Sequence, residues 1–393
     1  MRTVFRAIIF AASLFSALPL GAQPEGPERT LESLFEEERV DRDRFAPSFL
    51  SEIPAAEVTR IIEGIKRDFG ALAGIEATDD GFSLRFARAK VPARIVLDDE
   101  GRIAGLWFGP PLPQGDIEAQ AAAIMALPGQ TSLLVLSDGK PVVTHEAETP
   151  LAVGSGAKLA VLLALERAVA EGRLDWTDVA ELEPGWKSLP SGQLQDWPEG
   201  APLTIASLAH LMISISDNTA TDGLIDIVGR AAVEAVSPRN RPFLTTRELS
   251  ILKTQENAPL RQQWRSADAP ARQAILDRIA KAPLPSPGSL SPATTHEVGW
   301  FMTARELCDL LDATSGLPSL GIQPGPADRR RWKSVAYKGG SEVGVLNLSS
   351  RLVGEDGGVH CVVATWNGDD ALQQDKLLNP YRSLVDRLAA KSD

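Results

Sequence analysis

The stretch 151–165 constrains the fold of this chain more than any other. Every side chain from Leu159 to Leu165 is apolar, so this segment predicts a helix that is buried nearly all round. Such a helix needs a large hydrophobic core contributed by other elements. Small residues precede it, and Ser155 lies among them at the expected start of the helix. Lys158 follows three residues later and returns to the same side of the helix.

The pairing of Ser155 with Lys158 predicts a nucleophile beside its base. The N-terminus of a helix favours a developing negative charge, and a serine hydroxyl becomes reactive when a neighbouring group accepts its proton. Lys158 can accept a proton only when it is neutral, which requires burial or a nearby cation to lower its pKa.

The spacing itself is not specific, because Ser-x-x-Lys occurs three times in the chain. Ser137-Asp-Gly-Lys140 lies between apolar runs and predicts a hairpin turn. Ser250-Ile-Leu-Lys253 follows the capping pattern Thr245-x-x-Glu248, which places its serine inside a helix. Only Ser155 is expected at the N-terminus of a helix, where a developing negative charge is favoured.

Two further motifs follow in the chain. Ser216-Asp217-Asn218 ends a helical apolar pattern, and Tyr337-Lys338-Gly339-Gly340-Ser341 precedes a strand-like run that starts at Val343. The three motifs in this order resemble those of the penicillin-recognising serine hydrolases, especially class A β-lactamases. The resemblance extends over most of residues 113–393. Together with the additional N-terminal segment, it is greater for secreted two-domain relatives, including the β-lactamase-like protein of clavulanic acid biosynthesis.

The resemblance implies a role for each motif residue. Ser155 would form an acyl-enzyme with an amide or ester carbonyl, and Lys158 would accept its proton. Ser216 would relay the proton to the leaving group while Lys338 orients the Ser216 hydroxyl. Substrate binding is expected from Asn218, Gly340 and Ser341, with the backbone N–H groups of Ser155 and Ser341 as the oxyanion hole. Asp217 is expected to brace its loop instead.

Two departures from the family pattern affect these expectations. Lys338-Gly339-Gly340 replaces the usual Lys-Thr-Gly, so a hydroxyl that helps to bind a β-lactam carboxylate is missing, and Ser341 would replace it only partly. No E-x-x-L-N motif for a deacylating glutamate occurs between Ser216 and Lys338. Glu248 and Glu256 are the nearest candidates, and helix capping accounts better for Glu248. Deacylation is therefore expected to be slow or to favour esters.

The predicted function is a β-lactamase-related serine hydrolase that acts on a small-molecule β-lactam, ester or D-alanyl peptide. A slow-deacylating esterase, a D-Ala carboxypeptidase and a non-hydrolysing penicillin-binding receptor remain alternatives. Four scattered histidines show no paired metal-ligand spacing, so neither a metal nor a cofactor is expected. The net charge of −12 argues against nucleic acid and against an anionic membrane surface.

The order of predicted elements indicates an α+β chain in three parts. Residues 1–22, basic and then apolar, predict a signal peptide and a periplasmic or extracellular protein without a stable membrane span. Residues 24–112 predict a small cystatin/NTF2-like domain, expected to be a scaffold or to orient substrate. Residues 113–393 predict a β-lactamase/transpeptidase-like antiparallel sheet with flanking helices and an all-helical subdomain. Cys308 and Cys361 could form a disulfide or remain buried thiols.

Overall fold

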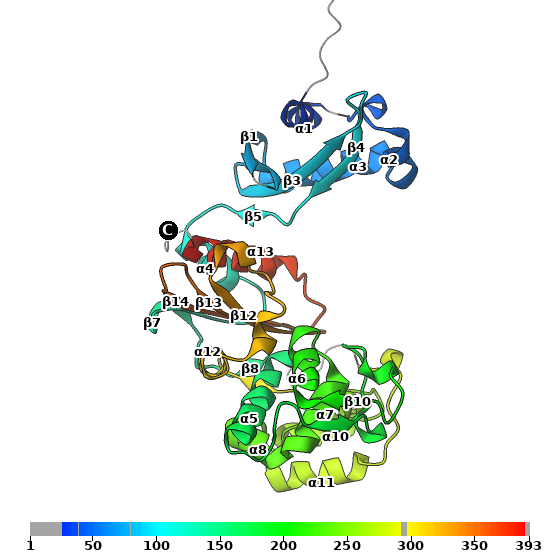
Figure 1. The fold of residues 1–393 in the computed structure, drawn as a ribbon, viewed down its shortest axis with the longest axis vertical. Coiled ribbons are helices and arrows are strands. Elements are labelled where there is room, and N and C mark those ends of the chain that lie inside the picture. The colour runs from blue at the N-terminus through cyan, green and yellow to red at the C-terminus, as the bar shows by residue number, and fades with distance from the viewer. Residues whose placement is uncertain (1–25, 38, 79, 292–296, 390–393) are drawn as a thin grey trace, which may run out of the picture. The chain divides into compact units, whose positions relative to one another are not determined.

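The computed structural model describes residues 26–37, 39–78, 80–291 and 297–389, and the chain divides into two compact units (Figure 1). The boundary lies between Pro111 and Leu112, one residue before the expected start of the second domain at residue 113. The predicted signal peptide, residues 1–22, lies outside the described residues. Among the helices of the described ranges, none has the length and apolar character needed to cross a membrane.

The first unit packs helices against an antiparallel sheet with the strand order β1-β2-β3-β4. Its elements are α1 (Pro27–Glu36), η1 (Arg42–Arg44), α2 (Pro47–Glu52), α3 (Ala55–Phe69), β1 (Leu72–Thr78), β2 (Gly81–Phe86), β3 (Ala89–Leu97) and β4 (Ile103–Phe108). The apolar stripe of Val58, Ile61, Ile62, Ile65 and Phe69 predicts a helix over 55–69, and α3 has these ends and buries Val58 and Ile62. Ile61 was expected on the same buried stripe, but this is wrong, because 38% of its surface is exposed.

A five-stranded antiparallel sheet forms the centre of the second unit. Its strand order is β12-β13-β14-β6-β7, with bounds β12 (Ser334–Glu342), β13 (Val345–Val353), β14 (Val359–Asn367), β6 (Gln130–Ser137) and β7 (Lys140–His145). The hairpin predicted around Asp138-Gly139 is confirmed, since both residues have positive φ. A strand was expected to start at Val343, but this residue lies in the turn between β12 and β13.

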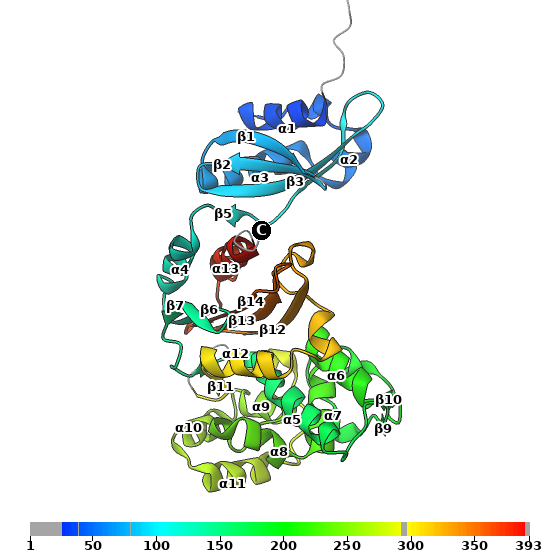
Figure 2. The ribbon, with the colours of Figure 1, turned by 60° about the vertical axis from the view of Figure 1, so that its left-hand side comes forward.

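Helices cover both faces of this sheet and close two hydrophobic cores. α4 (Ile117–Met125) and α13 (Asp375–Ala389) pack on one face, while α12 (Ala304–Ala313) and α5 (Lys158–Ala170) lie on the other (Figures 1 and 2). A disulfide joins Cys308 of α12 to Cys361 of β14, with a Cα–Cα distance of 6.0 Å. The sequence allowed either a disulfide or two buried thiols, and the structure contains the disulfide.

The segment between β8 (Leu151–Ala152) and β11 (Phe301–Met302) is mainly helical. It contains α6 (Ile205–Ser214), α7 (Asn218–Val228), α8 (Arg230–Val236), α9 (Thr246–Leu252), α10 (Ala258–Ser266) and α11 (Ala269–Ile279). Shorter pieces of the unit are β5 (Leu112–Pro113), β8 (Leu151–Ala152), β9 (Val179–Glu181), β10 (Pro202–Thr204), β11 (Phe301–Met302), η3 (Pro184–Trp186), η4 (Leu194–Asp196), η5 (Pro238–Asn240), η6 (Pro287–Ser289), η7 (Pro318–Gly321) and η8 (Arg329–Arg331). The subdomain is therefore not all-helical, because β8 pairs with β11 and β9 with β10.

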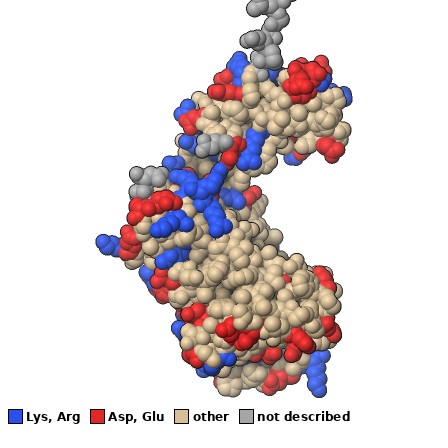
Figure 3. Space-filling view, in the orientation of Figure 1, with Lys and Arg blue, Asp and Glu red and all other residues tan. Residues whose placement is uncertain are grey.

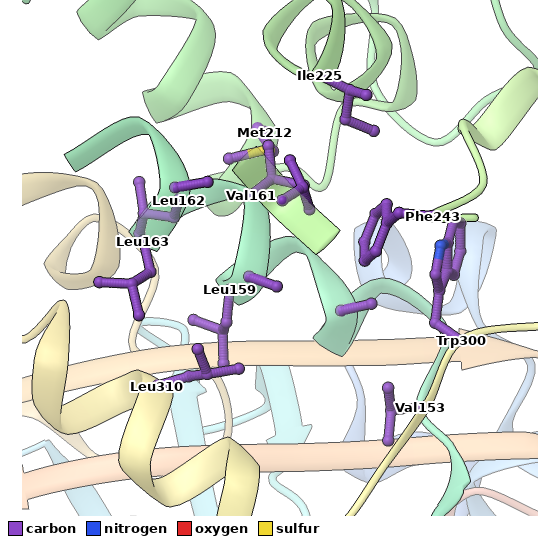
Figure 4. Close-up of a cluster of buried hydrophobic side chains, with 14 of the residues drawn as sticks. Val153, Leu159, Val161, Leu162, Leu163, Met212, Ile225, Phe243, Trp300 and Leu310 are labelled. Atoms are coloured by element: carbon purple, nitrogen blue, oxygen red, sulfur yellow. The ribbon is translucent and has the colours of Figure 1, made fainter. Parts of the chain in front are cut away.

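α5 is buried nearly all round, as its sequence predicts. Leu159 lies beside Leu310 of α12, and Val161 lies beside Met212 of α6 (Figure 4). A helix enclosed on all sides has a fixed position, so the residues at its first turn are also fixed. On the face of the helical part that Figure 3 shows, acidic side chains predominate over basic ones.

Candidate active site

Ser155 lies in a tight turn in front of α5. This turn, η2 (Gly154–Ala157), is a 3₁₀ helix, and the α-helix begins at Lys158 rather than at the serine. Gly154 has φ +49°, a left-handed conformation that favours glycine. A Cβ on Gly156 would lie 2.7 Å from Asn347 Oδ1. The small residues around Ser155 therefore allow its turn to pack directly against β13.

Lys158 is buried, with 2% of its surface exposed. Its Nζ donates to the Ser216 carbonyl at 2.6 Å and to Asn218 Oδ1 at 2.7 Å, and it lies 3.2 Å from Ser216 Oγ. Burial lowers the pKa of Lys158 well below its usual value, and the neighbouring Lys338 cation lowers it further. The Asn218 amide is held in turn by the Leu189 carbonyl at 2.9 Å.

Ser216 connects the two lysines. Lys338 Nζ donates to Ser216 Oγ at 3.1 Å and to the Gly339 carbonyl at 2.6 Å, and burial lowers the pKa of Lys338 to about 7. Ser216 has φ +60°, which is uncommon for a residue other than glycine. Its carbonyl also accepts a hydrogen bond from Ser191 Oγ at 2.6 Å. The surrounding contacts therefore hold Ser216 in a costly backbone conformation.

Asp217 braces this loop, as predicted. Its side chain is fully buried, caps α7 through Ala220 N at 2.8 Å, and accepts from Gln193 N at 2.7 Å and Leu194 N at 2.9 Å. With three N–H partners, the carboxylate is occupied in fixing the loop that carries Ser216. It does not line the cleft.

One open cleft brings together most of the predicted site residues. It is lined by Ser155, Ser216, Lys338, Gly340 and Ser341, while Lys158 and Asn218 reach it through their contacts with Ser216. Among the described residues, Ser155 Oγ has no hydrogen-bond partner, and none joins it to Lys158. Such bonds between nucleophile and base are often formed only when substrate is bound.

Gly340 fits β12 against the turn of Ser155. A Cβ at this position would lie 2.6 Å from Ser155 N and would overlap the Val153 carbonyl. The backbone N of Ser341 is likewise close to this turn, 3.4 Å from a Cβ built on Gly154. Because β12 is the edge strand of the sheet, part of its backbone N–H groups face away from the sheet and can reach a ligand.

The phenol of Tyr337 fills the space that a side chain at Gly339 would occupy. A Cβ built on Gly339 would overlap Tyr337 Oη. Tyr337 lines the cleft, burial raises its pKa to about 12, and within the described ranges its hydroxyl has no hydrogen-bond partner. Next to it, Ser341 Oγ accepts from Gln374 Nε2 at 3.1 Å. The cleft therefore presents the hydroxyl of Tyr337 as well as that of Ser341, which alone was expected to replace part of the missing threonine.

No aspartate or glutamate lines the cleft in the described part of the chain. The capping role predicted for Glu248 is confirmed, since it closes the capping box of α9 and pairs with Arg230 at 2.7 Å. Glu256 is exposed and is not among the cleft residues. The residue that contacts the Asn218 carbonyl from α9 is Thr246, through its Oγ1 at 3.2 Å.

Ser191, Tyr337 and Gln374 were not found by sequence reasoning. Tyr337 lies two residues before Gly339, and side chains two apart on a strand share a face. A strand prediction over this motif could therefore have placed Tyr337 beside Gly339. Ser191 and Gln374 lie in irregular segments without a motif, and only the tertiary structure brings them to the cleft. No group of three potential metal ligands occurs among the residues that the structure describes.

The second unit, an antiparallel sheet with helices on both faces and a mainly helical insert, has a β-lactamase/transpeptidase-like fold. Residues 116–304 match the model of the β-lactamase enzyme family. No curated protein sequence matches the chain.

Several solved structures are similar to the chain. A β-lactamase from Sphaerobacter thermophilus is 22% identical, with 70% of this chain and 96% of that chain covered and a TM-score of 0.48. A class A β-lactamase from Bacteroides cellulosilyticus is 16% identical, with 70% and 98% covered and a TM-score of 0.48. PBP-A is 18% identical, with 70% and 95% covered and a TM-score of 0.44.

Proposed function

We propose that this chain is an exported serine hydrolase that forms an acyl-enzyme at Ser155 with the amide bond of a β-lactam or with an ester. The main support is the hydrogen-bonded group of Lys158, Ser216 and Lys338 at the cleft that Ser155 lines. Export is supported by the basic and then apolar sequence of residues 1–22.

Acylation requires the amine of Lys158 to be neutral, so that it can accept a proton. Neutral Lys158 takes the proton of Ser155 as Oγ bonds to the carbonyl carbon, and the oxyanion is held by the N–H groups of Ser155 and Ser341. When the tetrahedral intermediate collapses, Ser216 gives its proton to the leaving nitrogen or oxygen. Lys158, 3.2 Å from Ser216 Oγ, returns a proton to that hydroxyl and becomes neutral again.

Labelling with a fluorescent penicillin tests this proposal. We expect one label per chain on the peptide that contains Ser155, and no label on the Ser155→Ala variant. Ser250→Ala is the matched control, because Ser250 belongs to another Ser-x-x-Lys sequence but its hydroxyl donates to the Thr246 carbonyl inside α9. Label that survives in Ser155→Ala would refute the proposal.

Slow deacylation is the second candidate, and the absence of a carboxylate from the described cleft lining favours it. Hydrolysis of the acyl-enzyme needs a base that activates water. With a chromogenic cephalosporin, a protein that does not hydrolyse its acyl-enzyme would give a burst of one product per chain without steady turnover. A hydrolase would continue to turn over, and an acetyl ester in parallel would separate an esterase from a lactamase.

A further inference from the structure

A second cavity of about 320 Å³ lies in the helical part of the second unit. It shares no lining residue with the cleft of Ser155. Its size is within the range of pockets that hold small organic ligands. The proposed function assigns nothing to it.

One side of this cavity is aromatic and rigid. Trp264, Trp300 and Phe301 line it, and the two tryptophans are only 4% and 6% exposed. Trp300 Nε1 donates to the Leu244 carbonyl at 3.1 Å, and its ring packs against Phe243 with centroids 6.1 Å apart. These rings are held in place before a ligand arrives, so binding against their accessible edges does not have to order them.

Three arginines give the same cavity a positive charge. Arg272 is partly buried and stacks over the Trp264 ring at 5.2 Å, and its Nε donates to the Trp264 carbonyl at 3.1 Å. No carboxylate of the described residues pairs with Arg272 or with Arg265. Arg239 reaches Glu306 only at 3.3 Å in an exposed pair.

The single acid in the lining does not neutralise these arginines. Glu297 pairs at 2.6 Å with Arg261, which is itself outside the cavity lining. Burial lowers the pKa of Arg272. A partly buried cation without an anionic partner is costly, so a bound anion would recover free energy there. In a chain with net charge −12, this concentration of cations is local.

We propose that this cavity is a binding site for a small organic anion with a flat apolar body. The oxyanion would pair with the guanidinium groups of Arg265 and Arg272, whose planar donors match a carboxylate. The flat body would contact the parts of Trp300 and Phe301 that line the cavity, since Arg272 already covers the Trp264 ring. This site is independent of acyl transfer at Ser155.

Titration calorimetry with 2-naphthoate tests the proposal, using the full chain with Ser155→Ala so that the other cleft cannot react. We expect saturable binding of one molecule per chain that weakens as salt is added. Arg265→Gln and Arg272→Gln should each weaken binding roughly tenfold, the usual effect of removing a hydrogen bond to a charged group. Arg278→Gln is the control, because this arginine lies on the same helix as Arg272 but outside the cavity.

The neutral 2-naphthamide separates charge from apolar contact and should bind much more weakly. Equal binding of the amide, no binding of naphthoate, or unchanged affinity in both cavity variants would overturn the proposal. Arg265 is exposed, so the Arg265→Gln variant should remain folded. The test therefore stays decisive even when Arg272→Gln unfolds.

Discussion

Lys158 and Lys338 determine the pH at which the proposed site can react. Lys158 must be neutral to accept a proton, and its pKa is lowered by burial and by the Lys338 cation. Acylation should therefore rise with pH as Lys158 loses its proton, and level off below the pH at which an ordinary lysine titrates. The acylation rate constant for a fluorescent penicillin, measured across the neutral and alkaline range, checks this expectation.

Lys338→Met tests the coupling between the two amines. Removing the cation should raise the pKa of Lys158, so the rising limb of the profile should move to higher pH. The plateau should fall by roughly 10²-fold, because Ser216 loses the group that orients its proton. Lys140→Met is the control, since Lys140 is exposed at a hairpin. A limb that stays in place would mean that Lys338 does not act on Lys158.

Tyr337 should determine affinity rather than the rate of the chemical step. Its hydroxyl remains protonated at physiological pH, because burial raises its pKa to about 12, and it has no partner in the described part of the cleft. Tyr337→Phe should raise KM roughly tenfold for a substrate with an acceptor beside the scissile bond, and leave kcat unchanged. Tyr381→Phe is the control, since that buried hydroxyl bonds Ser350 and Val362. A fall in kcat alone would contradict the assignment.

At the scale of elements, periodic segments could be predicted and irregular ones could not. The apolar run of α5 predicts its burial, and the stripe of α3 predicts the ends of that helix but not the exposure of Ile61. β8 and β11 are two residues each and pair across the helical segment. Such short strands have no alternating pattern of their own, so the local sequence does not predict them. The motif serines and lysines were found because their spacing is local, whereas Ser191, Tyr337 and Gln374 join the cleft only through tertiary packing.

The disulfide joins α12, on one face of the sheet, to β14, a strand of that sheet. Cys308 and Cys361 are 53 residues apart, so removing the bond should lower the free energy of unfolding by about 4 kcal/mol through the entropy of the unfolded chain. Denaturant unfolding of the Cys308→Ala/Cys361→Ala variant, followed by tryptophan fluorescence, measures this loss. A reducing agent should lower the stability of the unaltered chain by a similar amount and leave the variant unaffected. Equal stability of both proteins would contradict the expectation.

At the scale of the whole molecule, each unit closes its own hydrophobic core. The core of the first unit contains residues between Leu31 and Ile103, and the two cores of the second unit contain residues between Ile117 and Ala389. The residues that line the cleft of Ser155 all belong to the second unit. The first unit therefore contributes no lining residue to that cleft.

A fragment of residues 112–393 tests this separation. We expect it to fold alone and to be labelled by a fluorescent penicillin at the same rate as the full chain, because all proposed reacting groups and both supporting cores are retained. Circular dichroism and the labelling rate constant are the measurements, and the fragment with Ser155→Ala gives the background. A folded fragment that is labelled much more slowly would show that the first unit contributes to the reaction. In that case the substrate-orienting role would be preferred over that of a scaffold.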